Sequence, residues 1–102
     1  MDAAALLREL ITLPSVNPAF LPAGHPWAGE QRVCDFLAAT AARLGLDLDF
    51  QDVESGRRNL LARLCPVGRP RHRVILAPHL DTVGGSDIHF TPRAARSRLY
   101  GR

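Results

Sequence analysis

The stretch Arg73-Val-Ile-Leu-Ala-Pro-His-Leu-Asp-Thr-Val83 decides the predicted fold. It begins with a short, continuous apolar run, which is typical of a strand buried on both faces. Pro78 suits the end of such a strand because it has no backbone N–H to donate. His79 and Asp81 follow, and in extended chain residues two positions apart point to the same side. The stretch therefore predicts a buried strand that presents both side chains at its carboxyl end, where open α/β sheets build their sites.

His79 and Asp81 have the chemistry of a metal site. A neutral imidazole is a good zinc ligand. A ligating histidine usually donates its other ring N–H to a carboxylate or a carbonyl, which fixes the tautomer. His79 is therefore the candidate metal ligand, and Asp81 is the candidate supporting carboxylate. The tripeptide alone favours a structural interpretation, in which a strand-end histidine precedes an aspartate in a turn.

Two helices are predicted in the first half of the chain. Asp2 suits the N-cap of the first, whose apolar residues repeat at helical spacing until Pro14 stops it. Gly29-Glu30 begins the second, where an apolar stripe extends from residue 33 to residue 44. Gly45 fits the position just beyond the end of that helix. Both stripes must pack on a sheet or on another helix.

Three further strands are predicted. Apolar and polar residues alternate from Leu46 to Gln51, which indicates a half-buried strand with an acidic outer face. Residues 59–64 predict a second strand, antiparallel to the first because the connection through Ser55-Gly56 is short. Residues 98–100 predict another. Together with the strand at 73–77, they give an α/β fold with helices packed on a mixed β-sheet.

Four stretches of the chain together resemble one enzyme family. His79-Leu80-Asp81-Thr82-Val83 is similar to the first metal motif of the zinc hydrolases that include acetylornithine deacetylase, succinyl-diaminopimelate desuccinylase and glutamate carboxypeptidase. Leu13-Pro14-Ser15-Val16-Asn17-Pro18, Gly29-Glu30 and Arg98-Leu99-Tyr100-Gly101-Arg102 match the same family in the same order. Pro78 departs from the family, which more often has a small residue there.

The resemblance implies that residues 1–102 are the opening part of a zinc-exopeptidase-like catalytic domain. His79 matches a metal ligand, and Asp81 matches the carboxylate that supports this histidine and tunes the catalytic centre. The family uses two zinc ions, or cobalt or another divalent ion, to hydrolyse amide bonds of N-acyl amino acids or short peptides, and its full-length members are often homodimers. Its glutamate base, its other ligands and its dimerisation domain come from later segments. We therefore expect the chain alone to be inactive.

Charge and composition leave two alternatives open. Residues 1–56 hold three Arg and eight acids (−5), and residues 57–102 hold ten Arg and two acids (+8). Such a basic half is a signal for nucleic acid, but the arginines are scattered with little aromatic interleaving, so we expect no nucleic-acid partner. The other alternative is a small, non-catalytic α/β binding protein.

The sequence also predicts a cellular setting. It has no apolar run long enough to span a bilayer and no basic segment before an apolar stretch at its start, so we expect a cytoplasmic protein without a membrane partner. Cys34 and Cys65 fit no metal-binding spacing. We expect both to be reduced, partly buried side chains.

Overall fold

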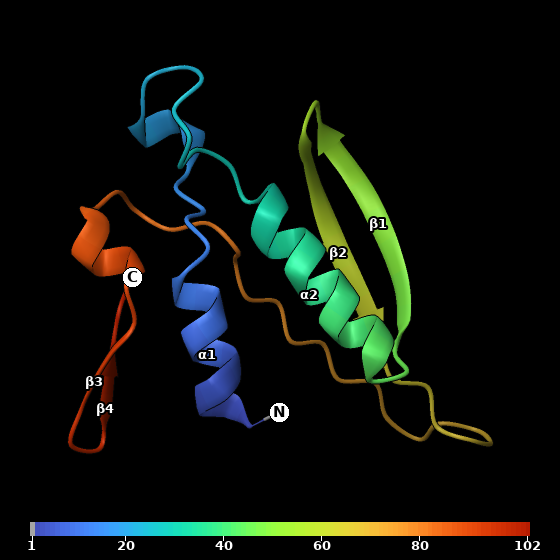
Figure 1. Ribbon diagram of the computed structural model, residues 1–102. Coiled ribbons are helices and arrows are strands. Elements are labelled where there is room, and N and C mark those ends of the chain that lie inside the picture. Colours follow the sequence, from blue (N-terminus) through green and yellow to red (C-terminus); the bar gives the residue numbers. More distant parts are fainter. Residues whose placement is uncertain (1) are drawn as a thin grey trace.

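The computed structural model describes residues 2–102. The α-helices come first along the chain, each strand then pairs with its neighbour in sequence, and the two antiparallel hairpins lie on either side of the helices (Figure 1). The elements are α1 (Ala3–Ile11), η1 (Pro18–Phe20), α2 (Gln31–Arg43), β1 (Asp47–Glu54), β2 (Arg57–Arg63), η2 (Asp87–Phe90), β3 (Arg93–Ala95) and β4 (Arg98–Tyr100). The predicted mixture of helices and strands is confirmed.

Helix α1 begins and ends as its sequence predicts. The Asp2 carboxylate accepts a hydrogen bond from the backbone N–H of Ala5 at 2.7 Å, which satisfies one of the free donors of the first turn. The helix ends at Ile11, because Pro14 has no N–H with which to continue it. Ile11 is buried and points its side chain toward the C-terminal hairpin, where it meets Gly101.

Helix α2 covers one face of the β1–β2 hairpin (Figure 1). Two ion pairs join them: Arg57 Nε lies 2.9 Å from Glu30 Oε1, and an Arg58 amino group lies 3.3 Å from Asp35 Oδ1. The Arg58 guanidinium also lies 3.8 Å above the ring of Phe50, a cation–π contact. These contacts neutralise acids of the first half of the chain with arginines of the second half.

The first hairpin confirms the predicted antiparallel pair. Strands β1 and β2 pair with Gln51 opposite Asn59, and the chain reverses through Ser55 and Gly56. Gly56 has a φ of 73°, a left-handed conformation that glycine adopts without strain. Residues 98–100 also form the predicted strand, which pairs with β3 in a second hairpin.

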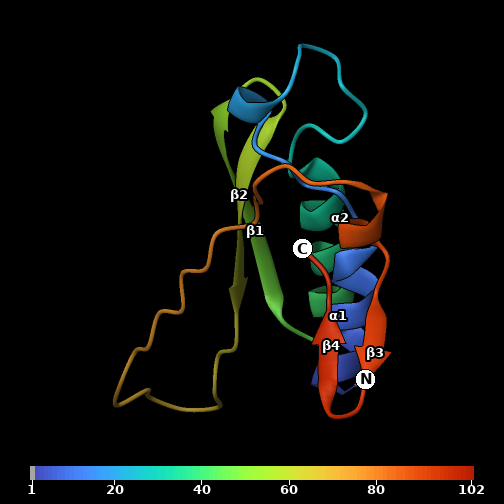
Figure 2. The same cartoon turned by 90° about the vertical axis from the view of Figure 1, so that its left-hand side faces the viewer.

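The predicted buried strand at residues 73–77 is wrong. The segment is extended but has no ladder partner in the part of the chain that the structure describes, and Val74, Ile75 and Leu76 are 81%, 81% and 86% exposed. The loop that connects β2 to this segment extends away from the hairpin (Figure 2). A continuous apolar run indicates a preference for burial, but burial also requires neighbouring strands and covered faces. The chain folds without supplying them here.

The predicted mixed sheet is wrong for the same reason. The strands of residues 2–102 form two separate two-stranded antiparallel sheets, β1–β2 and β3–β4. Parallel pairing occurs only as isolated bridges, which join Val16 to Ala28 and to Thr82. Without a strand at 73–77, nothing connects the two hairpins into one sheet.

The two cysteines lie in different environments. Cys34, on α2, is only 1% exposed and thus more deeply buried than predicted, whereas Cys65 is exposed and the prediction of partial burial is wrong there. Burial raises the pKa of the Cys34 thiol, and nearby Arg58 partly opposes this effect. The thiolate is the reactive form of cysteine. Cys34 should therefore react slowly, because its sulfur is buried and its raised pKa disfavours the thiolate.

We expect a thiol reagent to modify Cys65 first and Cys34 at least roughly 100-fold more slowly, because Cys34 reacts only after local opening. Mass spectrometry of the partly labelled chain, after digestion, measures both rates. Adding urea to unfold the chain serves as the control and should bring the two rates together. Similar rates in the folded chain would contradict the burial of Cys34 beneath the hairpin.

Candidate metal site

The loop that contains Val16 positions the candidate site. The backbone N–H of Asn17 donates to the carbonyl of Thr82 at 2.9 Å, and the N–H of Thr82 donates to the carbonyl of Ser15 at 2.9 Å. On its other side, Val16 donates to the carbonyl of Trp27 at 3.0 Å. Val16 therefore lies between Ala28 and Thr82 and forms an isolated parallel bridge with each. Its side chain is fully buried.

Helix α2 holds this loop through one side chain. Arg32 donates to the carbonyl of Pro14 at 2.8 Å and to the carbonyl of Pro26 at 2.6 Å. A guanidinium suits this task because its planar fork presents several donors in fixed directions. The two ends of the loop are thereby tied to the start of the helix.

Asp81 lies between Asn17 and His79. The Asn17 side-chain amide donates to Asp81 Oδ2 at 2.9 Å, and Asp81 Oδ1 lies 3.1 Å from Nδ1 of His79. The hydrogen bond from Asn17 lowers the pKa of the Asp81 carboxyl below its ordinary value, and the neighbouring imidazole acts in the same direction. Asp81 is therefore held as a carboxylate with both oxygens engaged.

The contacts of His79 determine which ring nitrogen is free. Its Nδ1 lies 2.8 Å from the carbonyl oxygen of Asp81 and 3.1 Å from the carboxylate of the same residue. Both neighbours are acceptors, so in the neutral ring Nδ1 carries the proton and Nε2 keeps its lone pair. The His79 side chain is 85% exposed. It therefore presents an accessible Nε2 in the tautomer that binds a metal ion.

Two other histidines have the opposite arrangement. Nδ1 of His25 accepts a hydrogen bond from the N–H of Trp27 at 3.1 Å, and Nδ1 of His89 accepts one from the N–H of Ser86 at 3.0 Å. A backbone N–H can only donate, so the neutral form of each ring carries its proton on Nε2. Binding a metal through Nε2 would require each to change tautomer and lose this hydrogen bond.

His79 and Asp81 form a pair without a third metal-ligating side chain beside them in residues 2–102. Within residues 2–102 no group of three or more His, Cys, Asp or Glu side chains gathers in an arrangement that could hold a metal ion. A catalytic zinc ion takes about three protein ligands and a structural one about four. These residues therefore fit one ligand position with its supporting carboxylate.

The sequence predicted His79 and Asp81 but not Asn17. The spacing of two between the histidine and the aspartate indicated that they would meet, and the structure confirms this contact. Asn17 lies 64 positions from Asp81, and only the folding of the Val16 loop onto Thr82 brings it close. Its place inside a stretch that resembles the zinc hydrolases was the only available signal.

Replacing Asn17 by alanine is expected to lower the free energy of unfolding by about 1–2 kcal/mol, because it removes the hydrogen bond to Asp81 and the one that Asn17 Oδ1 accepts from the N–H of Ala19. Asn17→Asp should cost more, because a second carboxylate would then face Asp81 Oδ2. Urea denaturation measures both. Asn59→Ala, at an exposed position of β2, is the matched control and should change stability by less than about 0.5 kcal/mol. Equal effects of Asn17→Ala and Asn59→Ala would contradict the role of Asn17.

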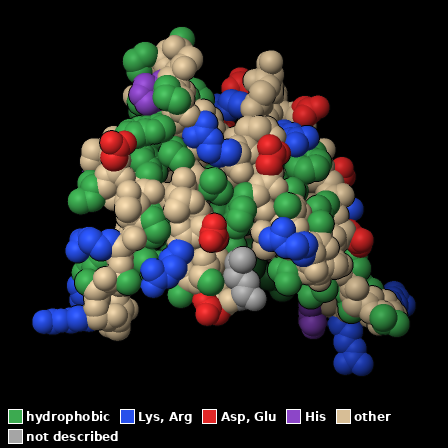
Figure 3. All heavy atoms as spheres, viewed as in Figure 1, with side chains coloured by type: hydrophobic (Ala, Val, Ile, Leu, Met, Phe, Trp, Pro, Cys, Tyr) green, Lys and Arg blue, Asp and Glu red, His purple; other side chains and the backbone are tan. Residues whose placement is uncertain are grey.

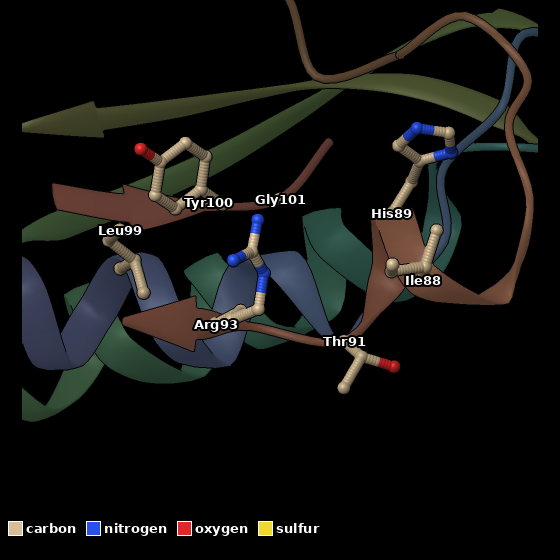
Figure 4. Close-up of a pocket in the computed structure, with 7 residues that line it drawn as sticks. All are labelled: Ile88, His89, Thr91, Arg93, Leu99, Tyr100 and Gly101. Atoms are coloured by element: carbon tan, nitrogen blue, oxygen red, sulfur yellow. The ribbon is translucent and has the colours of Figure 1, made fainter. Parts of the chain in front are cut away.

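A pocket lies elsewhere, at the C-terminal hairpin. It is a hollow of about 360 Å³, and the Arg93 side chain reaches across it toward Tyr100 and Gly101 (Figure 4). The Arg93 guanidinium lies 4.6 Å above the Tyr100 ring. The lining residues are Ile88, His89, Thr91, Arg93, Leu99, Tyr100 and Gly101. His79 and Asp81 are not among them, so the candidate metal site does not open into this pocket.

Comparison of the chain with protein-family models, with curated proteins and with solved structures gives no match. The resemblance to the zinc hydrolases therefore rests on the four quoted stretches of sequence. Among the helices of residues 2–102, none combines the length and the apolar character needed to cross a membrane.

Proposed function

We propose that this chain is part of the catalytic domain of a metal-dependent hydrolase that cleaves the amide bond of N-acyl amino acids or short peptides. In this proposal His79 is one ligand of a binuclear zinc site, and Asp81 is the carboxylate that orients it. A zinc ion in such a site polarises the scissile carbonyl and lowers the pKa of a bound water. In this proposal, other segments of the hydrolase supply the remaining metal ligands and the general base. Residues 1–102 alone are therefore inactive.

One observation carries the proposal. Nδ1 of His79 faces two oxygen acceptors of Asp81, which leaves Nε2 of the neutral ring unprotonated on an exposed side chain. This carboxylate–histidine arrangement orients metal-ligating histidines in general. Asn17 supports it, because its amide keeps Asp81 ionised and limits the rotation of the carboxylate. The chain's own contribution is thus a ligand whose tautomer and direction are fixed before any metal binds.

Zinc titration followed by NMR tests this contribution. We expect the imidazole signals of His79 to shift at lower zinc concentration than those of His25 and His89. We also expect long-range proton–nitrogen spectra to show an unprotonated Nε2 only for His79 among these three. Asp81→Asn should weaken the response of His79 roughly tenfold, as loss of a supporting carboxylate generally does. His89→Gln is the matched control and should leave the His79 response unchanged.

A stronger response from His25 or His89 would overturn the assignment of His79 as the ligand. Purified residues 1–102 with added zinc should show no hydrolysis of N-acetyl amino acids, and measurable turnover would contradict the proposed incomplete site. The protein captured from its native source with an antibody to this chain tests the catalytic role. It should hydrolyse these substrates and lose activity with a chelator. An inactive captured protein of 11.2 kDa would overturn the hydrolase function.

A non-catalytic binding role is the second candidate. The exposure of Val74, Ile75 and Leu76 favours it, since a continuous apolar segment in water is typical of an interaction surface. A soluble and inactive protein of 11.2 kDa from the native source would support this alternative.

A further inference from the structure

Residues 71–77 have the properties of an unpaired strand. Arg71 lies in a bend, residues 72–77 run on without a helix, turn or bend (Figure 2), and none of the backbone N–H or C=O groups of residues 71–77 takes part in a backbone–backbone hydrogen bond within the described residues. Val74, Ile75 and Leu76 are exposed, and two of these three are β-branched residues that favour strands. A segment with free hydrogen-bonding groups and apolar side chains on both faces is a template for pairing with another strand.

The charge around this segment indicates the chemistry of its partner. Arg69, Arg71 and Arg73 occur within five positions, and the next acidic residue along the chain is Asp81. At the lower right extremity of the molecule, where this part of the chain lies, basic and apolar side chains appear side by side (Figure 3). A second copy of the same segment would bring these arginines close to one another. Charge therefore favours an acidic strand as the partner.

Strand β1 is such an acidic strand. It carries Asp47, Asp49, Asp52 and Glu54, and the first two lie on the same face because they are two positions apart. In the two-stranded sheet, β1 pairs only with β2, so its outer edge is free. The N–H of Phe50 bonds instead to the side chain of Asp49 at 2.9 Å, which shows that this N–H points away from the ladder. The outer edge thus presents backbone groups outside the ladder and negative charge, and a strand added there would compete with Asp49 for the N–H of Phe50.

The segment cannot reach this edge in its own chain. Strand β2 lies between residues 71–77 and β1 in the views of Figures 1 and 2. The free edge of β1 faces outward on the far side of the hairpin. Only the β1 strand of another molecule is accessible to the segment.

We propose that residues 71–77 of one copy of this chain add as a strand to the outer edge of β1 of a second copy. A parallel register places Arg71 opposite Asp47 and Arg73 opposite Asp49, and it places Val74 opposite Phe50. Cross-strand pairs of opposite charge and of apolar with aromatic side chains both stabilise a sheet. The contact joins different surfaces of the two copies, so it repeats from copy to copy and the assembly grows with concentration.

Paired charge reversal tests the proposal. Sedimentation velocity of the wild-type chain should show species heavier than 11.2 kDa that increase with concentration. Asp47→Arg with Asp49→Arg in one variant, and Arg71→Asp with Arg73→Asp in another, should each weaken association roughly tenfold or more, because each places like charges across the contact. An equal mixture of the two variants restores opposite charges in both directions and should associate as the wild type does.

The four substituted side chains lie on exposed positions, so folding should persist, and amide NMR spectra check this. Ile75→Pro and Leu76→Pro provide a second test that does not involve charge. Adjacent N–H groups of a strand point to opposite edges, so one of these two prolines should block pairing. Ile75→Ala and Leu76→Ala are the matched controls, since they keep the N–H. The decisive proline should weaken association more than its alanine control does.

A wild-type chain that stays at 11.2 kDa over the whole concentration series overturns the proposal. Association that survives either charge reversal, or that the mixture fails to restore, also overturns it and indicates unspecific apolar contact. Equal effects of proline and alanine at both positions would exclude strand pairing. These outcomes do not depend on zinc or on hydrolysis, so they separate this interface from the proposed catalytic role.

Discussion

Val16→Ala is expected to lower the free energy of unfolding by about 2 kcal/mol, because it removes two methyl groups from a fully buried site. Val16→Asp should abolish cooperative unfolding, since an ionised carboxylate at this position would have no partner in an apolar surrounding. The effect should extend to the candidate metal site. Val16 lies between Trp27 and Thr82, and the backbone of Thr82 connects this loop to Asp81.

Urea denaturation measures the loss of stability, and the amide NMR signals of Asn17, Asp81 and Thr82 report the connection to the site. Val53→Ala is the matched control, because Val53 is 67% exposed on β1 and the chemical change is the same. Its effect should stay within about 0.5 kcal/mol. If the two alanine variants have equal stability, Val16 is not the centre of the loop packing. If Val16→Ala leaves the Asp81 signals in place, the loop does not position the site.

The elements that could be predicted are those with local causes. Asp2 caps α1 by a contact three residues away, and Gly45 ends α2 with a φ of 78°. The β1–β2 hairpin follows from the short turn at Ser55 and Gly56. Each of these depends on a few neighbouring residues, so the sequence contains the whole physical reason.

The elements that could not be predicted depend on distant partners. The apolar run at Val74 to Ala77 has the composition of a central strand, but composition does not supply the neighbouring strands that would bury it. The same distinction holds at the site. His79 and Asp81 are two positions apart, and their contact was predictable, whereas the bond from Asn17 spans 64 positions.

Gly101→Ala is expected to lower the free energy of unfolding by about 1–3 kcal/mol through overpacking. A Cβ atom at this position would lie 2.5 Å from Cγ2 of Ile11 and 2.6 Å from its Cγ1. Ile11 is only 4% exposed, so its side chain has little room to move. The chain end cannot withdraw freely either, because the N–H of Arg102 donates to the carbonyl of His89 at 2.7 Å.

A double-mutant cycle isolates this contact. Ile11→Ala alone should destabilise the chain by leaving a cavity, and Gly101→Ala added to it should cost much less than in the wild type. Gly84→Ala is the matched control, because no heavy atom lies within 4 Å of its added Cβ and its φ is not positive. Additive effects of the two substitutions would contradict the packing of α1 against the end of β4.

The outcome also bears on why a glycine lies between Tyr100 and Arg102. The Tyr-Gly-Arg stretch contributed to the resemblance with the zinc hydrolases, which assigns Gly101 no role of its own. Close contact with Ile11 gives a sufficient packing reason. A strong coupling between Gly101 and Ile11 in thermal or urea denaturation, without any change in the zinc response of His79, would show that this glycine serves the packing of α1 and β4. A change in the zinc response with little loss of stability would instead assign it to the site.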